Sequence, residues 1–306
     1  MSLFEVSDKR LSLLRDELSQ LSISDEVRGW NYSSPPVRPP PSPVSLTVSE
    51  LSARYCETLR DIYLRRVKKV QQPLTVKLAR GSVLHEVIRA TIAESKKFIY
   101  SEPKSSGYDL ILKYADEGFE AGIASLAGRP GEEGAIKKLE EEAKDLHLFL
   151  LIGVASRLDD ARSRFPHAAE DSLVSAAVPS VSERKVDGSL VGLSRELSVD
   201  LYAPYNAVVD IKTGEEREFH PLTAAGYALA LESEGQAEVN YGIITYLRMQ
   251  GKTPSVSSKY FVVGDEIRRE FLEIRDEALE VVRTGKDPGK PDNCPAYCPY
   301  YSICNP

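Results

Sequence analysis

Four cysteines, divided between the two ends of the chain, place the strongest constraint on its fold. Cys56 lies near the N-terminal end, whereas Cys294, Cys298 and Cys304 follow one another within a short tail. Three thiolates at this spacing can converge on one metal centre, and a closed tetrahedral site needs a fourth ligand. If Cys56 is that ligand, the two ends of the chain must meet. In the alternative interpretation, Cys56 is a buried free thiol and a histidine completes a zinc site in the tail.

The sequence shows no segment typical of export or membrane insertion. The N-terminal stretch MSLFEVSDKR lacks the apolar run of a signal peptide, and LHLFLLIGVA is too short to span a bilayer. We therefore expect a cytoplasmic protein without a membrane partner. In that reducing compartment, thiols favour metal binding or catalysis over disulfides.

The net charge of −7 for 306 residues argues against a protein that is coated in nucleic acid. It does not exclude a local DNA-binding groove. The densest basic run is RDIYLRRVKKV, which contains Arg60, Arg65, Arg66, Lys68 and Lys69. This run is typical either of a solvated helix face or of contacts to a DNA backbone.

The first half of the chain has mainly helical periodicity. We expect a helix over residues 3–20, another from about Ser49 that contains Cys56, and a third from near Ser82. Residues 105–165 also read as helical, with a break at 128–134. Between the first two helices, SSPPVRPPPSP is too rich in proline for a helix and predicts an extended polyproline connector.

Beyond residue 175 the pattern changes to short β-rich segments. VPSVSERKV, SLVGLS, ELSVDLY, AVVDIKT, VNYGIITYLRM and SVSSKYFVV predict strands, and LTAAGYALALE predicts a helix with Pro221 in its first turn. A final helix is expected from about Asp265 to Arg283, before a turn-rich tail. The resulting plan is a mixed α/β protein with four segments, namely residues 1–45, 46–175, 176–285 and 286–306.

The stretch ELSVDLYAPYNAVVDIKTG predicts a β-hairpin that carries two carboxylates. If the hairpin is centred near Tyr205, Asp200 and Asp210 lie opposite each other and share a face with Lys212. Like charges directly opposite in a sheet are destabilising, and a divalent cation between them would offset the repulsion. Oxygen ligands suit Mg²⁺ or Mn²⁺. The alternative is a charged, solvated outer face of the hairpin.

The segment VVDIKTG resembles the D-x-K motif of the PD-(D/E)xK nucleases, with Asp200 as the preceding acidic residue. His85 in GSVLHEVI fits the upstream histidine of the RecB-like branch. Tyr227 fits the tyrosine of the Q-x-x-x-Y motif, although Thr223 stands where glutamine is expected. One early cysteine followed by three in the tail resembles the CRISPR-associated exonucleases of Cas family four. The tail spacing departs from that family, because three residues rather than two separate Cys294 from Cys298.

The resemblance implies a RecB-like, restriction-endonuclease-like fold. Its mixed central sheet would be flanked by helices, with a helical N-terminal part and a cysteine-rich tail. It also implies an exonuclease that cleaves single-stranded DNA for CRISPR spacer acquisition, together with other adaptation proteins. The implied cofactors are Mg²⁺ or Mn²⁺ and an iron–sulfur cluster, with 4Fe–4S favoured over 2Fe–2S. The implied site comprises the metal ligands His85, Asp200, Asp210 and the Ile211 carbonyl, the catalytic residues Lys212 and Tyr227, and the cluster ligands Cys56, Cys294, Cys298 and Cys304.

Two other functions remain open at this point. The chain could be a non-catalytic DNA-binding or scaffold subunit of an adaptation complex, for which Thr223 is the sequence support. It could also be a DNA-binding protein in which the cysteines hold zinc.

Overall fold

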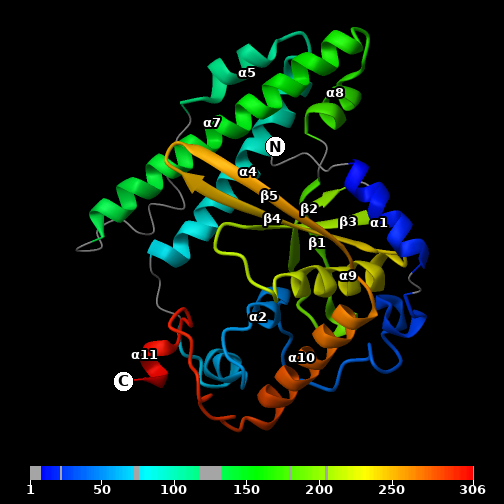
Figure 1. Ribbon diagram of the computed structural model, residues 1–306, viewed down its shortest axis with the longest axis vertical. Coiled ribbons are helices and arrows are strands. Elements are labelled where there is room, and N and C mark those ends of the chain that lie inside the picture. Colours follow the sequence, from blue (N-terminus) through cyan, green and yellow to red (C-terminus); the bar gives the residue numbers. More distant parts are fainter. Residues whose placement is uncertain are drawn as a thin grey trace.

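A five-stranded sheet forms the centre of the protein in the computed structural model (Figure 1), which describes residues 8–20, 23–71, 76–116, 132–178, 181–203 and 206–305. The strands follow one another across the sheet in chain order, and all neighbouring pairs are antiparallel except β3 and β4. Their bounds are β1 (Val181–Val186), β2 (Leu197–Ala203), β3 (Ala207–Lys212), β4 (Tyr241–Gln250) and β5 (Thr253–Val262). The predicted mixed α/β class is confirmed.

One predicted strand is wrong. Within SLVGLS, residues Ser189–Val191 form the 3₁₀ helix η4, which is flanked by Gly188 and Gly192. Gly192 has a φ of 77°, a left-handed conformation that glycine adopts without steric cost. The two glycines allow a tight turn, so the apolar residues of this segment reach the core from a turn rather than from a strand.

Parallel pairing of β3 and β4 requires a crossover connection, which α9 (Pro221–Gly235) supplies. Pro221 occupies the first turn of this helix, as predicted. A Cβ atom at Gly226 would lie 2.5 Å from the ring of Phe271 on α10 (Asp265–Thr284). The missing side chain at this position therefore allows α9 and α10 to pack closely. Both predicted helices are confirmed.

Within the described ranges, five helices share one core with Val209 and Ile211 of β3. These are α1 (Asp8–Gln20), α4 (Val76–Ser101), α5 (Gly107–Tyr114), α7 (Glu133–Arg164) and α8 (Glu170–Ala177). Helix α4 starts six residues before the predicted Ser82. Most of the predicted break at 128–134 lies outside the described residues.

A second core contains Val208 of β3 together with α9, α10 and α2 (Val48–Ser52). The N-terminal segment contributes Val37 and Leu46 to this core. It begins with η1 (Asp25–Val27) and η2 (Gly29–Asn31), and Gly29 of η2 packs against Leu229 and Glu232 of α9. Consecutive β3 residues thus face different cores, as expected for a strand buried on both sides. In the described part of the chain, no helix combines the length and apolar character needed to cross a membrane.

The first half of the proline-rich segment is not the extended connector that its composition predicts. Residues 32–38 form turns, in which the Arg38 N–H donates to the carbonyl of Ser34, whereas residues 39–42 have no regular secondary structure. Val37 is buried, and the guanidinium of the fully buried Arg275 donates to the carbonyls of Pro36 and Val37. The segment folds onto α10 because an arginine distant in sequence satisfies its backbone carbonyls.

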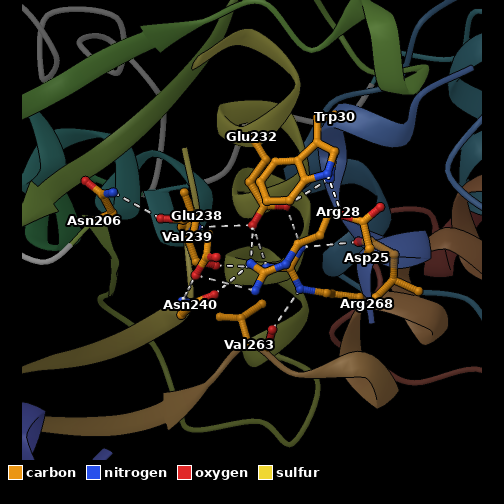
Figure 2. Close-up of polar contacts among 12 residues, drawn as sticks. Asp25, Arg28, Trp30, Asn206, Glu232, Glu238, Val239, Asn240, Val263 and Arg268 are labelled. Carbon is orange, nitrogen blue, oxygen red and sulfur yellow. Dashed lines mark hydrogen bonds and ion pairs between the residues drawn. The ribbon is translucent and has the colours of Figure 1, made fainter. Parts of the chain in front are cut away.

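A buried ionic network fixes the N-terminal segment to the ends of α9 and α10 (Figure 2). Both Arg28 and Arg268 donate to Glu232 at 2.8 Å, and the side chains of Arg268 and Glu232 are fully buried. Arg28 also donates to Asn240, and Arg268 donates to the carbonyl of Val239. Every charged group in this network therefore has a partner, which is the condition for burying charge without a large penalty.

Candidate active site

The predicted carboxylate hairpin forms with the expected register. Ala203 pairs with Ala207 and Leu201 with Val209, so one further step places Asp200 opposite Asp210. The predicted turn residue Tyr205 lies outside the described part of the chain. Asp210 is 6 % exposed, and its Oδ2 atom lies 2.8 Å from Lys212 Nζ. Strand alternation thus brings the two acids and the lysine together, as the sequence predicted.

His85 reaches the same carboxylates from α4. Its Nδ1 atom lies 3.5 Å from Asp200 Oδ1, while the backbone N–H of Ile211 donates to Asp200 Oδ2 at 2.9 Å. Asp200 therefore connects α4 to the backbone of β3. The structure brings His85, Asp200, Asp210, Ile211 and Lys212 into one site.

The two carboxyl groups differ electrostatically because their surroundings differ. Burial and the neighbouring Asp200 raise the pKa of Asp210, against the opposing effect of Lys212. Burial would also raise the pKa of Asp200, but His85, the Ile211 N–H and Lys212 together lower it. The pKa of His85 is raised by Asp200 and Asp210 in spite of burial. Such a pair of carboxyls is stabilised in its fully ionised form by additional positive charge.

The donor set fits a hard divalent cation. Asp210 Oδ2 is shielded from solvent and accepts no well-directed hydrogen bond within the described residues, although Lys212 lies beside it. Two carboxylates, an imidazole and the Ile211 carbonyl are ligands that Mg²⁺ and Mn²⁺ accept. Among the residues that the structure describes, no three His, Cys, Asp or Glu side chains already stand in the geometry of a metal site. Lys212 and His85 supply the charge balance in this arrangement.

These residues line an open pocket of about 340 Å³. It is bounded by α2, the end of β3, the loop that follows β3, and α9. Besides the residues already described, its walls contain Ser49, Thr213, Gly214, Glu215, His220, Thr223 and Tyr227.

Two residues of α9 contact or approach the charged centre. Lys212 Nζ lies 3.5 Å from the hydroxyl of Thr223, which donates to Ser52 of α2 at 3.0 Å. Thr223, which stands at the expected glutamine position, thus links the lysine to α2. Burial and the nearby Asp200 and Asp210 raise the pKa of Tyr227, so its phenol is a neutral hydrogen-bond donor.

His220 is a pocket residue that the sequence reasoning missed. The backbone N–H of Arg217 donates to His220 Nδ1, and the Tyr246 hydroxyl lies 3.1 Å from the same nitrogen. Because Nδ1 accepts a hydrogen bond, the neutral ring carries its proton on Nε2. Burial, with Lys212 and Arg217, lowers the pKa of His220 to about 4. Its position directly before Pro221, at the start of a helix, is the one sequence signal that marks it.

The lowered pKa of His220 predicts acid sensitivity. Above pH 6.5 the ring is neutral in both the folded and the unfolded chain. As the pH falls from 6.5 towards about 4, the unfolded chain takes up a proton that the folded chain excludes, so stability falls. Allowing for solvent screening of this half-buried ring, the wild type should lose about 1–2 kcal/mol more across this range than His220→Gln.

Urea denaturation at a series of pH values measures this difference. The exposed His167 at the turn between α7 and α8 provides the control variant, His167→Gln. Parallel stability curves for the wild type and His220→Gln between pH 6.5 and 4 would contradict the prediction.

The second predicted site brings together the ends of the chain. Cys56 does not lie within a helix as expected, because α2 ends at Ser52 and Cys56 occupies a turn before α3 (Arg60–Ile62). Arg54 and Leu59 have φ values of 45° and 60°, which interrupt a helix. The spacing of the apolar residues is therefore that of a helical face, but no single helix contains Leu51, Tyr55 and Leu59.

The segment that contains this turn lies beside the C-terminal tail (Figure 1), and side-chain contacts hold the two together. The Thr58 hydroxyl donates to the carbonyl of Gly289 at 2.7 Å, and Arg60 pairs with Asp287 at 2.9 Å. Arg60 also lies 3.5 Å from the sulfur of Cys304, which is the last residue of the short helix α11 (Tyr301–Cys304).

We refer to Cys56, Cys294, Cys298 and Cys304 as the cysteine cluster. All four are free thiols. Burial raises the pKa of Cys298 to about 11, and Cys294 and Cys56 are close enough to contribute to that shift. Cys298 packs with Tyr63, Leu64 and Tyr300, and Cys304 borders the same group. The two ends of the chain thus meet as predicted, while in the described part of the chain no three of these thiols stand in the geometry of a metal site. Thiols are the soft donors that iron and zinc prefer.

Three arginines of the basic run form ion pairs with carboxylates of the same chain. Arg65 and Arg66 pair with the buried Glu50, and Arg60 pairs with Asp287. These arginines support η3 (Tyr63–Val67), a π-helical turn beside the cysteine cluster. These ion pairs tie the three arginines to the rest of the chain, while the Arg65 side chain stays 51% exposed to solvent.

Comparison with known proteins finds similarity to one family over the whole chain. A family model described as CRISPR-associated exonuclease Csa1 matches residues 1–306. A CRISPR-associated exonuclease Csa1 from Saccharolobus solfataricus is 34% identical over 305 residues, which cover 99% of each chain. A second, from Thermoproteus tenax, is 32% identical over 290 residues, covering 92% of this chain and 91% of that relative.

Proposed function

Because the chain belongs to the family of CRISPR-associated exonucleases Csa1, we propose that it is a metal-dependent exonuclease that processes single-stranded DNA for CRISPR spacer acquisition. The observation that carries this proposal is the convergence of His85, Asp200, Asp210 and Lys212 in one pocket. The proposed fold is the RecB-like nuclease fold, supported by the β2–β3 hairpin and the crossover helix α9. Its partners would be single-stranded DNA and other adaptation proteins.

In the proposed site, His85, Asp200, Asp210 and the Ile211 carbonyl would hold Mg²⁺ or Mn²⁺. When bound, such an ion supplies a Lewis acid that activates water and stabilises negative charge on the phosphate. Burial and repulsion from Asp200 raise the pKa of Asp210 and so oppose its ionisation. A bound cation would offset this repulsion between the two carboxylates.

The remaining residues act on the phosphate and the attacking water. Lys212, whose pKa is raised by Asp210 and Asp200 in spite of burial, remains protonated and stabilises charge that develops on the phosphate. Its hydrogen bond to Thr223 keeps the ammonium group oriented toward the site. The neutral phenol of Tyr227 donates a hydrogen bond, either to DNA or to the carboxylates.

For the cysteine cluster we propose an iron–sulfur cofactor, with 4Fe–4S favoured over 2Fe–2S. Four thiols from both chain ends provide the ligand set that such clusters require. The Arg60 guanidinium near Cys304 would stabilise a thiolate there. A cofactor that ties Cys56 to the tail closes a very long loop, and the bound state is therefore expected to be more stable.

Protein purified without oxygen should contain iron and sulfide and should absorb visible light. Cys298→Ser is expected to lose both the iron and the absorption, and to lower the Tm by about 5 °C or more. Metal analysis, an absorption spectrum and a thermal melt measure these effects. Ser302→Ala, in the same tail, is the matched control and should retain iron. Zinc in place of iron would contradict the iron–sulfur proposal, and it would favour a zinc-binding cysteine cluster.

A further inference from the structure

An aromatic–cation stack joins the cysteine cluster to the rim of the catalytic pocket. Tyr297 lies between Cys294 and Cys298, and the guanidinium carbon of Arg217 is 4.5 Å from the centre of its ring. The Tyr55 ring lies beside Tyr297, with ring centres 6.5 Å apart and planes tilted by 55°. The three side chains come from three separate segments, so the stack exists only in the folded protein.

The stack is physically connected to the pocket. Arg217 belongs to the loop between β3 and α9, and its backbone N–H donates to the pocket residue His220. Glu215, two residues earlier, also lines the pocket and pairs with the Arg217 guanidinium at 2.9 Å. Arg217, and with it the stack, is therefore in contact with two residues of the pocket wall.

The exposure of the stack distinguishes it from a contact that merely joins two loops. Tyr297 is 39% exposed and the Arg217 side chain is 36% exposed. Two further apolar residues of the tail, Tyr301 and Ile303, are 40% and 44% exposed. A planar ring and a planar guanidinium thus remain partly open to solvent beside the pocket.

We propose that Arg217 and Tyr297 form a stacking site for an unpaired base of the DNA substrate, adjacent to the scissile phosphate. Aromatic rings and arginine planes stack on bases of any sequence, and an unpaired base has a free face that a paired base in a duplex lacks. The site therefore selects single strands. This inference rests on the proposed action on single-stranded DNA.

The charge distribution makes stacking important for this protein. The net charge of the chain is −7. Long-range attraction to the DNA backbone is therefore weaker than for a basic protein, and contacts to bases must supply a larger share of the affinity.

Fluorescence anisotropy with a short fluorescein-labelled oligothymidylate, without added divalent metal, tests the proposal. Tyr297→Ala should weaken binding of the single strand by about 5- to 150-fold. Tyr297→Phe keeps the ring and should bind within about twofold of the wild type. Duplex affinity should be the same in all variants. Tyr108→Ala removes an exposed tyrosine from α5 and serves as the control for a general surface effect.

Because Tyr297 lies between two residues of the cysteine cluster, Arg217→Ala provides an independent variant outside that loop, and it should also weaken single-strand binding selectively. Unchanged single-strand affinity in folded Tyr297→Ala or Arg217→Ala overturns the proposal, as does an equal loss on duplex DNA. Since binding is measured without cleavage, a nuclease-inactive wild type that still shows the Tyr297 effect would refute the proposed function alone. Normal cleavage without that effect would refute the stacking site alone.

Discussion

Asp210→Ala is expected to lower kcat/KM for Mn²⁺- or Mg²⁺-dependent DNA cleavage by about a thousandfold or more, equivalent to about 4 kcal/mol of transition-state stabilisation. Asp210 is the most buried acid of the pocket, and its Oδ2 atom has unused capacity as an acceptor. Removing it also deprives Lys212 of its closest carboxylate. The effect should therefore fall on kcat, with a weaker dependence of the rate on metal concentration.

Cleavage of a labelled single strand under a titration of Mn²⁺ measures this effect. Asp160→Asn, which removes an exposed carboxylate from α7, is the matched control and should cleave at the wild-type rate. The stability of Asp210→Ala must be measured alongside, so that unfolding is distinguished from lost chemistry. Wild-type rates in folded Asp210→Ala would show that the metal site has been placed on the wrong residues. DNA binding without cleavage in the wild type itself would favour the scaffold alternative.

Glu232→Ala is expected to lower the free energy of unfolding by about 3–5 kcal/mol. This carboxylate is fully buried and pairs with both Arg28 and Arg268 (Figure 2). Its removal leaves two guanidinium groups without their shared counter-charge in the interior. It also removes the acceptor for the Gly29 N–H, which lies 2.9 Å from Oε2. The N-terminal segment should consequently detach from α9.

Guanidinium denaturation of the wild type and the variant gives the difference in the free energy of unfolding. Glu234→Ala removes an exposed carboxylate two residues along the same helix, and it should change that free energy by less than about 0.5 kcal/mol. Equal effects of the two substitutions would contradict the prediction, because they would show that the ion pairs of Glu232 add nothing to the stability beyond the effect of alanine on the helix. Since Glu232 lies at the far end of α9 from Thr223, the folded fraction of Glu232→Ala should retain its kcat.

Several parts of the fold were predictable because their signals are local. The alternation along β2 and β3 and the short connection between them set the hairpin register, and with it the proximity of Asp200, Asp210 and Lys212. Helices α9 and α10 were recognisable from their composition and periodicity. These features depend on residues a few positions apart, for which periodicity is a reliable guide.

Two of the errors have a common physical origin in contacts between distant residues. The predicted helix around Cys56 and the predicted connector at 33–43 both rest on local composition. In the structure, Thr58 bonds to Gly289, and Arg275 satisfies the carbonyls of the proline-rich segment. Since a turn becomes stable once its polar groups find partners, these long-range bonds outweigh local propensity.

By itself, the sequence determined that the two acids and the lysine share one face of a hairpin, through the period of a strand, and it marked the four cysteines as candidate ligands through their type and spacing. Only the tertiary structure decided what surrounds them. It placed His220 in the pocket, Thr223 against Lys212, and Tyr297 against Arg217. It also engaged the basic run in internal ion pairs. The physical reason is that such partners are brought together by packing of separate elements, which no local pattern encodes.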